Sequence, residues 1–301
     1  MTTDEIITAD GHRIRVLSWL PETARPEAVI QLFHGLGEHA GRYERFAKNC
    51  NDRSIAVVAH NHRGHGDAAK VPGHFADSDG WNLLISDAIK VQDRIAQRFP
   101  ALPIVLFGHS MGSFIAQSFA MRHPDNLAML ILSASTFGKR SEIRAANTLA
   151  RGLALLGKRA KPGVLNALGF GAFNKSFRPT RTEMDWLSRD EQEVDKYMAD
   201  PLCGGLFSAQ LWIDLTGGLL EVTSLSAIAK IPAALPVLIL GGERDPVGGT
   251  KGLERLASAY RDTGHRDLTL KKYDGGRHEM LNETNRDEVT SDVLNWVSSR
   301  L

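Results

Sequence analysis

The chain has 301 residues, of which 43% are hydrophobic, enough to bury a large core in one α/β domain with an insertion. Its formal net charge is +1, and no long run of like charges occurs, so we expect no nucleic-acid partner. Residues 1–5 are acidic rather than basic, and no apolar stretch approaches the ~18 residues of a membrane span. We therefore expect a soluble, cytoplasmic protein.

Apolar runs alternate with helical patterns between residues 28 and 135, an order typical of βαβ units and a parallel sheet. Before this region, residues 14–19 alternate between apolar and polar side chains, which predicts an antiparallel lead-in strand. Strands that helices cover on both faces are almost entirely apolar, and such runs lie at 28–33, 55–59, 104–107 and 129–132. The sequence therefore predicts an α/β fold on a mostly parallel sheet.

The strand pattern returns at 237–240 and 268–273, and helical patterns follow each of these runs. Residues 137–230 interrupt the rhythm, because they are helical in pattern, with Gly and Pro between the segments and no convincing strand. We interpret them as a helical cap inserted after the sixth strand. The expected domains are a core of residues 1–136 and 231–301 and a cap of residues 137–230.

The start of the expected cap is basic and amphipathic. Residues 139–161 hold an apolar stripe and a single acid, Glu142, together with seven basic residues, Lys139, Arg140, Arg144, Arg151, Lys158, Arg159 and Lys161. Such a segment can contact an anionic lipid surface transiently. The more common alternative is a helix that packs on the core and exposes its basic face to solvent.

The most informative motif is Gly108-His109-Ser110-Met111-Gly112, which follows the apolar run at 104–107 and leads into a helical pattern. A G-x-S-x-G turn between a strand and a helix exposes the serine hydroxyl in a strained backbone conformation. Glycine is needed on both sides because a Cβ there would collide with the neighbouring strand or helix. Ser110 is therefore the candidate nucleophile.

A serine hydroxyl is a poor nucleophile at neutral pH, so Ser110 needs a general base and an acid that orients this base. In α/β-hydrolases the acid and then the histidine follow the nucleophile, each after a later strand. Asp245 and His278 each follow one of the two late strands, and parallel strands end at the same sheet edge. Glu243 is the rival acid, and His265 is a weaker rival base because it precedes its strand.

Backbone N–H groups must bind the oxyanion of the tetrahedral intermediate that such a serine forms. We expect the first from Met111, directly after the nucleophile. The second is expected from Leu36, in the glycine-rich loop His34 to His39 that follows the strand at 28–33.

A competing site is His60-Asn61-His62-Arg63-Gly64-His65, whose histidines have the spacing of binuclear zinc hydrolases. Those sites normally have an aspartate where this chain has Gly64, so hydrogen-bonded imidazoles are the favoured interpretation. Cys50 and Cys203 are too few for a disulfide framework and lack metal-ligand spacing. We expect no metal and no other cofactor.

Taken together, these segments resemble the monoacylglycerol lipase and lysophospholipase branch of the α/β-hydrolases, a family of serine hydrolases. The resemblance spans residues 10–300 and rests on His34-Gly35-Leu36-Gly37-Glu38-His39, Arg42-Tyr43, His62-Arg63-Gly64-His65-Gly66, Gly108 to Gly112, Asp245-Pro246-Val247 and His278-Glu279-Met280-Leu281-Asn282-Glu283. It implies the α/β-hydrolase fold, with a mostly parallel eight-stranded sheet flanked by helices and an inserted helical cap. Asn61 and Ala68 depart from the aspartate and serine common in such relatives.

The resemblance implies a serine carboxylic-ester hydrolase without a cofactor, which acts through an acyl-enzyme on monoacylglycerol or lysophospholipid-type monoesters. The alternative is a general carboxylesterase on short, aromatic or polymeric esters. An acyltransferase and a non-catalytic binding protein on the same fold are less favoured. A peptidase would need an acidic group in the cap, for which the sequence offers Glu183, Asp185, Asp190, Glu191, Glu193 and Asp195. Acyl-chain length, leaving group and oligomeric state stay open.

Overall fold

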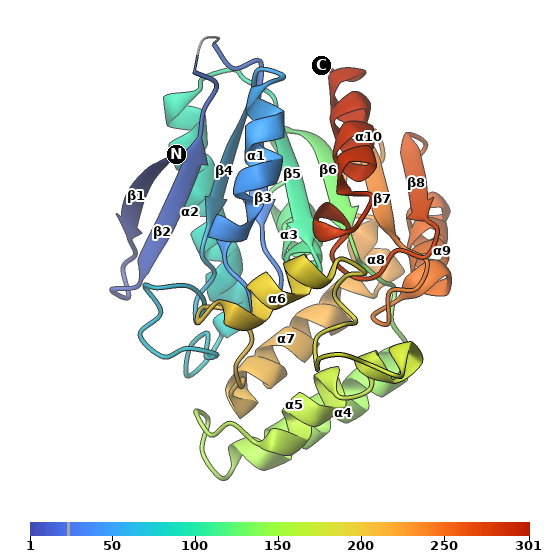
Figure 1. Ribbon diagram of the computed structural model, residues 1–301. Coiled ribbons are helices and arrows are strands. Elements are labelled where there is room, and N and C mark those ends of the chain that lie inside the picture. Colours follow the sequence, from blue (N-terminus) through green and yellow to red (C-terminus); the bar gives the residue numbers. More distant parts are fainter. Residues whose placement is uncertain (23–24) are drawn as a thin grey trace.

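A computed structural model describes residues 1–22 and 25–301 of the chain (Figure 1). Its centre is an eight-stranded sheet in the order β1-β2-β4-β3-β5-β6-β7-β8. The strands are β1 (Thr2–Ile7), β2 (Arg13–Trp19), β3 (Ala28–Phe33), β4 (Ile55–His60), β5 (Ile104–His109), β6 (Leu127–Ser133), β7 (Val237–Gly242) and β8 (Leu268–Tyr273).

The sheet is mostly parallel, as predicted. β2 pairs antiparallel with β1 and with β4, and all other neighbouring strands are parallel. The strand β1 was not among the segments predicted one by one. Five of its six side chains are exposed at the edge of the sheet, so its sequence lacks the apolar alternation of a half-buried strand.

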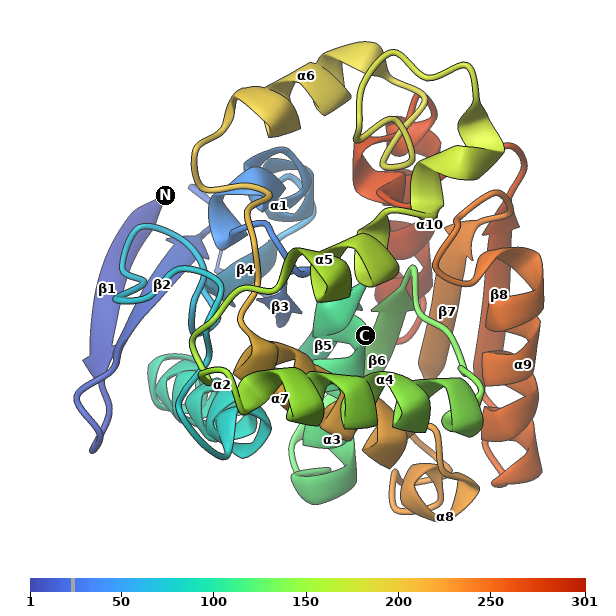
Figure 2. The ribbon, with the colours of Figure 1, turned by 90° about the horizontal axis from the view of Figure 1, so that it is seen from below.

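Helices cover both faces of the sheet (Figure 2). On one face, α1 (Glu44–Asn51) and α10 (Arg286–Ser298) pack on the central strands. The other face is covered by α2 (Gly80–Arg98), α3 (Met111–Arg122) and α9 (Gly249–Asp262). The central strands are thus buried on both faces, which explains why their sequences are almost unbroken apolar runs.

The chain between β6 and β7 forms five α-helices and one 3-10 helix, Phe173–Phe177, and most of it lies beyond one end of the sheet (Figure 1). The α-helices are α4 (Arg140–Ala154), α5 (Gly163–Phe170), α6 (Glu191–Ala199), α7 (Ala209–Val222) and α8 (Leu225–Ile228). α4 packs against α7, and α7 in turn packs on α2 and α3 of the core. Within residues 1–22 and 25–301, every helix is too short or too polar to cross a membrane.

Candidate active site

Ser110 lies at the turn from β5 into α3, with φ 52° and ψ −119°. A positive φ is strained for a residue with a Cβ, and a hydrogen bond of 2.9 Å from Ser110 N–H to Ser133 O holds the turn. A Cβ on Gly108 would lie 2.3 Å from the carbonyl oxygen of Gly112. A Cβ on Gly112 would lie 2.1 Å from that of Phe33. The predicted strand, turn and helix are present, and both glycines are required by lack of space.

Asp245 and His278 come together at the same end of the sheet, after β7 and β8. The Nδ1 of His278 lies 2.9 Å from Oδ1 of Asp245, which also accepts a hydrogen bond of 2.9 Å from Val247 N–H. Both side chains are buried. This contact makes Nδ1–H the donor to the carboxylate and leaves Nε2 for proton exchange with a reacting group.

The surroundings of His278 favour its protonated form. Burial, the largest single influence, lowers the pKa of the imidazole, but the carboxylates of Asp245, Glu279 and Glu38 together outweigh it, with Asp245 contributing most. The net pKa of His278 is therefore raised above the ordinary histidine value. An imidazole with this property is suited to accept a proton from a serine hydroxyl during a reaction.

The rival residues lie elsewhere. Glu243 is exposed, and the ring of His265 packs against Tyr260 at a centroid distance of 4.9 Å. The described residues that line the cavity around Ser110 include His278 but neither Glu243 nor His265.

Leu36, in the loop after β3, lines the same cavity as Ser110 and Met111. The backbone N–H groups of the two residues that flank Leu36 already have acceptors within the protein. Gly35 N–H donates to Glu38 Oε1 at 2.6 Å, and Gly37 N–H donates to His65 Nε2 at 3.2 Å. Met111 is the first residue of α3, where backbone N–H groups have no acceptor within the helix. The two residues whose N–H groups are predicted to bind an oxyanion therefore line one cavity.

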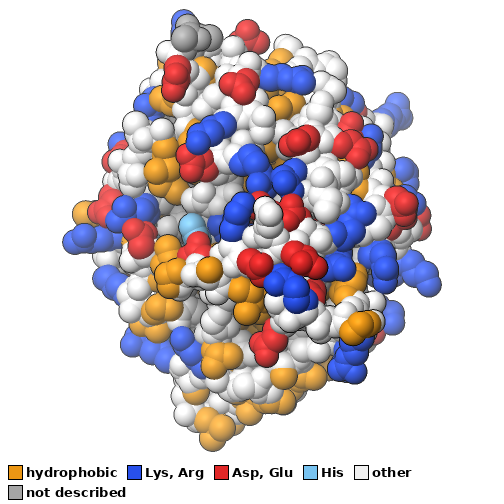
Figure 3. Space-filling view, viewed as in Figure 1, with side chains coloured by type: hydrophobic (Ala, Val, Ile, Leu, Met, Phe, Trp, Pro, Cys, Tyr) orange, Lys and Arg blue, Asp and Glu red, His pale blue; other side chains and the backbone are white. Residues whose placement is uncertain are grey.

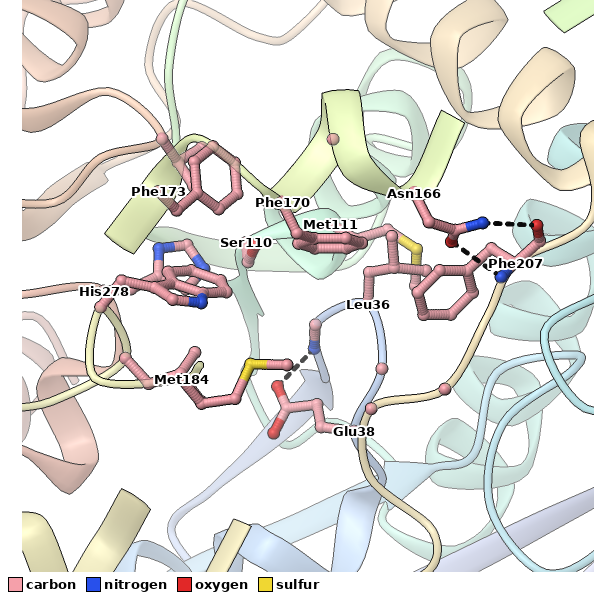
Figure 4. A pocket seen from close by; sticks show the side chains of 18 of the residues that line it. Leu36, Glu38, Ser110, Met111, Asn166, Phe170, Phe173, Met184, Phe207 and His278 are labelled. Carbon is pink, nitrogen blue, oxygen red and sulfur yellow. Dashed lines mark hydrogen bonds between the residues drawn. The ribbon is translucent and has the colours of Figure 1, made fainter. Parts of the chain in front are cut away.

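Ser110 opens into a cavity of about 480 Å³, a size typical of small-molecule sites. Its walls are mainly apolar and come from the core and from the insertion between β6 and β7 (Figure 4). The insertion contributes six aromatic residues to this lining, Phe170, Phe173, Trp186, Tyr197, Phe207 and Trp212. Asn166 is a polar exception, but its amide is bonded to the backbone N–H and C=O of Phe207. The cavity is therefore built to hold an apolar group next to the serine.

The histidine-rich segment after β4 lies behind the loop of Leu36. His34 Nε2 accepts a hydrogen bond of 3.0 Å from His62 N–H, and the rings of His34 and His62 lie 4.2 Å apart. Burial lowers the pKa of His60 to about 3 and that of His65 to about 4. These imidazoles are thus neutral and pack as core residues.

One other group of the described residues brings potential metal ligands together. Atoms of His39, Asp200 and Cys203 lie within 4.8 Å of one another. However, His39 Nε2 lies 2.9 Å from Asp200 Oδ2, and His39 Nδ1 accepts a hydrogen bond from Gly41 N–H. Both ring nitrogens are engaged within the protein, and burial raises the pKa of the Cys203 thiol, so this group favours a hydrogen-bonded contact over a metal site.

The sequence pattern of the family described as serine aminopeptidase, S33, matches residues 24–285. The chain is 31% identical to the human monoglyceride lipase over 98% of this chain and 90% of that protein. It is 29% identical to the monoacylglycerol lipase of Mycolicibacterium smegmatis, over 97% and 95% of the two chains. A solved structure of a thermostable carboxyl esterase from Bacillus coagulans, in complex with glycerol, superposes with a TM-score of 0.91, at 25% identity and over 99% and 98% of the chains.

These matches agree with the eight-stranded sheet and with the motifs read from the sequence. The chain belongs to the serine aminopeptidase S33 family of α/β-hydrolases, in the branch of the monoacylglycerol lipases.

Proposed function

We propose that the protein is a serine carboxylic-ester hydrolase that cleaves monoacylglycerols and related single-chain esters through an acyl-enzyme. The observation that carries this proposal is a hydroxyl, Ser110, that shares one apolar cavity with the paired imidazole of His278. We further propose that residues 137–230 act as a cap over a core of residues 1–136 and 231–301.

In the proposed reaction, Ser110 Oγ attacks the ester carbonyl while Nε2 of His278 takes the hydroxyl proton. Asp245 holds the imidazole with its Nδ1–H toward the carboxylate. The N–H groups of Leu36 and Met111 bind the oxyanion. The leaving alcohol takes the proton from His278, and an acyl-serine ester remains. Water then attacks this ester, giving its proton to His278, and release of the acid restores the Ser110 hydroxyl.

The apolar lining supports an acyl chain as the bound part of the substrate. Burial of each CH₂ contributes about 0.8 kcal/mol, so a chain that fills the cavity supplies most of the binding energy. The relatives support glycerol as the leaving group. The similar human and mycobacterial proteins are monoglyceride lipases, and the similar esterase was solved in complex with glycerol. Glycerol monoesters are therefore the favoured substrates over short or aromatic esters.

The test is an ester panel that varies acyl length and head group, run with the wild type and with Ser110→Ala. We expect a maximum of kcat/KM for a monoacylglycerol and loss of all hydrolysis in Ser110→Ala. Labelling of the wild type, but not of Ser110→Ala, by a fluorophosphonate separates an enzyme from a binding protein. Higher kcat/KM for short or aromatic esters would favour a general carboxylesterase, and a labelled Ser110→Ala would overturn the assignment of the nucleophile.

A peptidase is the second candidate, because the family description names an aminopeptidase and Glu183 lines the cavity. The other acids considered for binding an α-amine form contacts within the protein. Asp190 is paired with Arg286, Glu193 with Arg45 and Asp195 with Arg181. Amino-acyl p-nitroanilides are the discriminating substrates, and we expect no hydrolysis of them. Turnover that is lost in Glu183→Gln would support the peptidase.

We also propose that the cap contacts anionic membranes. Leu155 and Leu156 are 89% and 80% exposed, and Leu168 is 65% exposed. Hydrophobic side chains gather over the end of the molecule that holds α4 and α5, with Lys and Arg beside them (Figure 3). Exposed leucines next to basic residues are typical of a surface that enters the lipid head-group region.

Vesicle sedimentation tests this surface. Leu155→Asp should weaken binding to vesicles that contain phosphatidylglycerol, whereas Leu225→Asp, at an exposed leucine of α8, should leave it unchanged. Equal binding of both variants would exclude the proposed contact.

A further inference from the structure

Three charged side chains with little solvent exposure, Glu38, Arg42 and Glu279, lie side by side at the candidate active site, and both glutamates line its cavity. Arg42, in the short helix Ala40–Tyr43, donates from Nη1 to Glu38 Oε2 at 2.8 Å. It also forms a two-pronged contact with Glu279, from Nη1 to Oε1 at 2.6 Å and from Nη2 to Oε2 at 2.7 Å. The side chains are 10% exposed for Arg42 and less for both glutamates. Charged groups with so little water contact have one preferred geometry.

Each carboxylate is tied to a different part of the site. Glu38 accepts hydrogen bonds from Gly35 N–H at 2.6 Å and from the Tyr43 hydroxyl at 2.8 Å. Gly35 directly precedes Leu36, whose N–H is the proposed oxyanion donor (Figure 4). Glu279 directly follows His278 in the chain. A single guanidinium therefore joins the backbone that carries the oxyanion donor to the backbone that carries the general base.

The charges of this group do not cancel. Two carboxylates face one guanidinium, and both carboxylates raise the pKa of His278, although less than Asp245 does. Removing the guanidinium would leave two like charges buried together, which is costly. The arrangement thus needs Arg42 for stability and leaves one negative charge near the imidazole.

We propose that Arg42 is a positioning residue, which holds the Leu36 N–H and the His278 imidazole in register, while the excess negative charge stabilises the imidazolium formed during the reaction. This inference rests on the proposed function, because it assigns a role in the same ester hydrolysis. It gives Arg42, Glu38 and Glu279 a role that acts through the Leu36 loop and His278.

Arg42→Lys keeps the charge but cannot make the two-pronged contact. Loss of an oxyanion donor costs a factor of about 10²–10³ in kcat, so we expect kcat to fall by about tenfold or more while KM changes by less than about threefold. The matched control is Arg45→Lys, because Arg45 also joins two elements, with bonds to Glu193, Leu281 O and Asn282, but touches neither Glu38 nor Glu279. A folded Arg42→Lys with wild-type kcat would overturn the proposal.

Glu279→Gln tests the charge without changing the shape. Loss of this negative charge should lower the pKa of His278, so the acid limb of the kcat/KM profile should move to lower pH, and kcat should fall. A purely structural role predicts a lower melting temperature with an unmoved acid limb, and that result would overturn the electrostatic part. If Ser110→Ala keeps activity, the proposed function itself fails; if Ser110→Ala is inactive and both variants match the wild type, only the role of Arg42 fails.

Discussion

The indole of Trp186 lies against the imidazole of His278, with the ring centroids 4.9 Å apart and the ring planes at 44°. The backbone N–H of His278 also donates to the carbonyl oxygen of Trp186 at 3.4 Å. A residue of the insertion between β6 and β7 therefore touches the proposed general base through both side chain and backbone. The insertion both lines the cavity and helps to fix the orientation of the imidazole.

Replacement of Trp186 should affect both stability and turnover. Trp186→Ala removes a buried indole, which typically costs about 3–5 kcal/mol of unfolding free energy, and frees one side of the imidazole. Trp186→Phe keeps an aromatic ring against His278 and should retain more of both properties. Urea unfolding and kcat on a soluble ester measure the two effects. Equal kcat values for the alanine variant and the wild type would show that the indole does not orient His278.

Asp245→Asn should lower kcat by up to about 10⁴-fold, because an amide no longer requires Nδ1–H of His278 as the donor and the wrong tautomer becomes populated. The matched control is Glu243→Gln, which changes the same functional group two residues earlier, at an exposed side chain. Steady-state kinetics on one ester compares the two. A large loss in Glu243→Gln with a small loss in Asp245→Asn would mean that the acid was wrongly assigned.

The proposed catalytic residues could be selected from the sequence because parallel strands can be recognised in it as apolar runs. The residues that directly follow parallel strands lie at the same edge of the sheet. Ser110 and Asp245 follow such apolar runs, and His278 follows β8, whose side chains are mostly half-buried. Trp186 could not be selected in this way, because it lies in a segment between helices whose path depends on packing. Glu38, Arg42 and Glu279 entered the sequence analysis only as part of the segments that resemble the family. Their positions beside a glycine or next to the proposed histidine were the one available signal that these side chains would be buried.

Gly112→Ala should prevent stable folding, because the added methyl would lie 2.1 Å from the carbonyl oxygen of Phe33 and 2.6 Å from that of His34. Neither oxygen can move without displacing the end of β3. Gly152→Ala is the matched control, since this glycine lies in α4 and its added Cβ would have no neighbour within 4 Å. There the substitution should stabilise the helix by about 0.5–1 kcal/mol. Melting temperatures of the two variants should therefore move in opposite directions, and a Gly112→Ala protein with wild-type stability would contradict the close packing of the turn.

The unfolding free energy should decrease as the pH falls below about 6.5, because several buried histidines stay neutral in the folded chain. Burial lowers the pKa of His65 and of His109 to about 4, and that of His60 to about 3. Between these values and the ordinary pKa of about 6.5, the unfolded chain binds protons that the folded chain does not. Each such group then lowers the unfolding free energy by up to about 1.4 kcal/mol per pH unit, and the decrease grows with the number of groups.

His278 acts in the opposite direction, because its pKa is raised and its charged form favours folding at acid pH. Urea unfolding at pH 7.5, 6.5 and 5.5 measures the balance of one raised against several lowered groups. Stability that is unchanged over this range would mean that the groups with a lowered pKa do not outweigh His278.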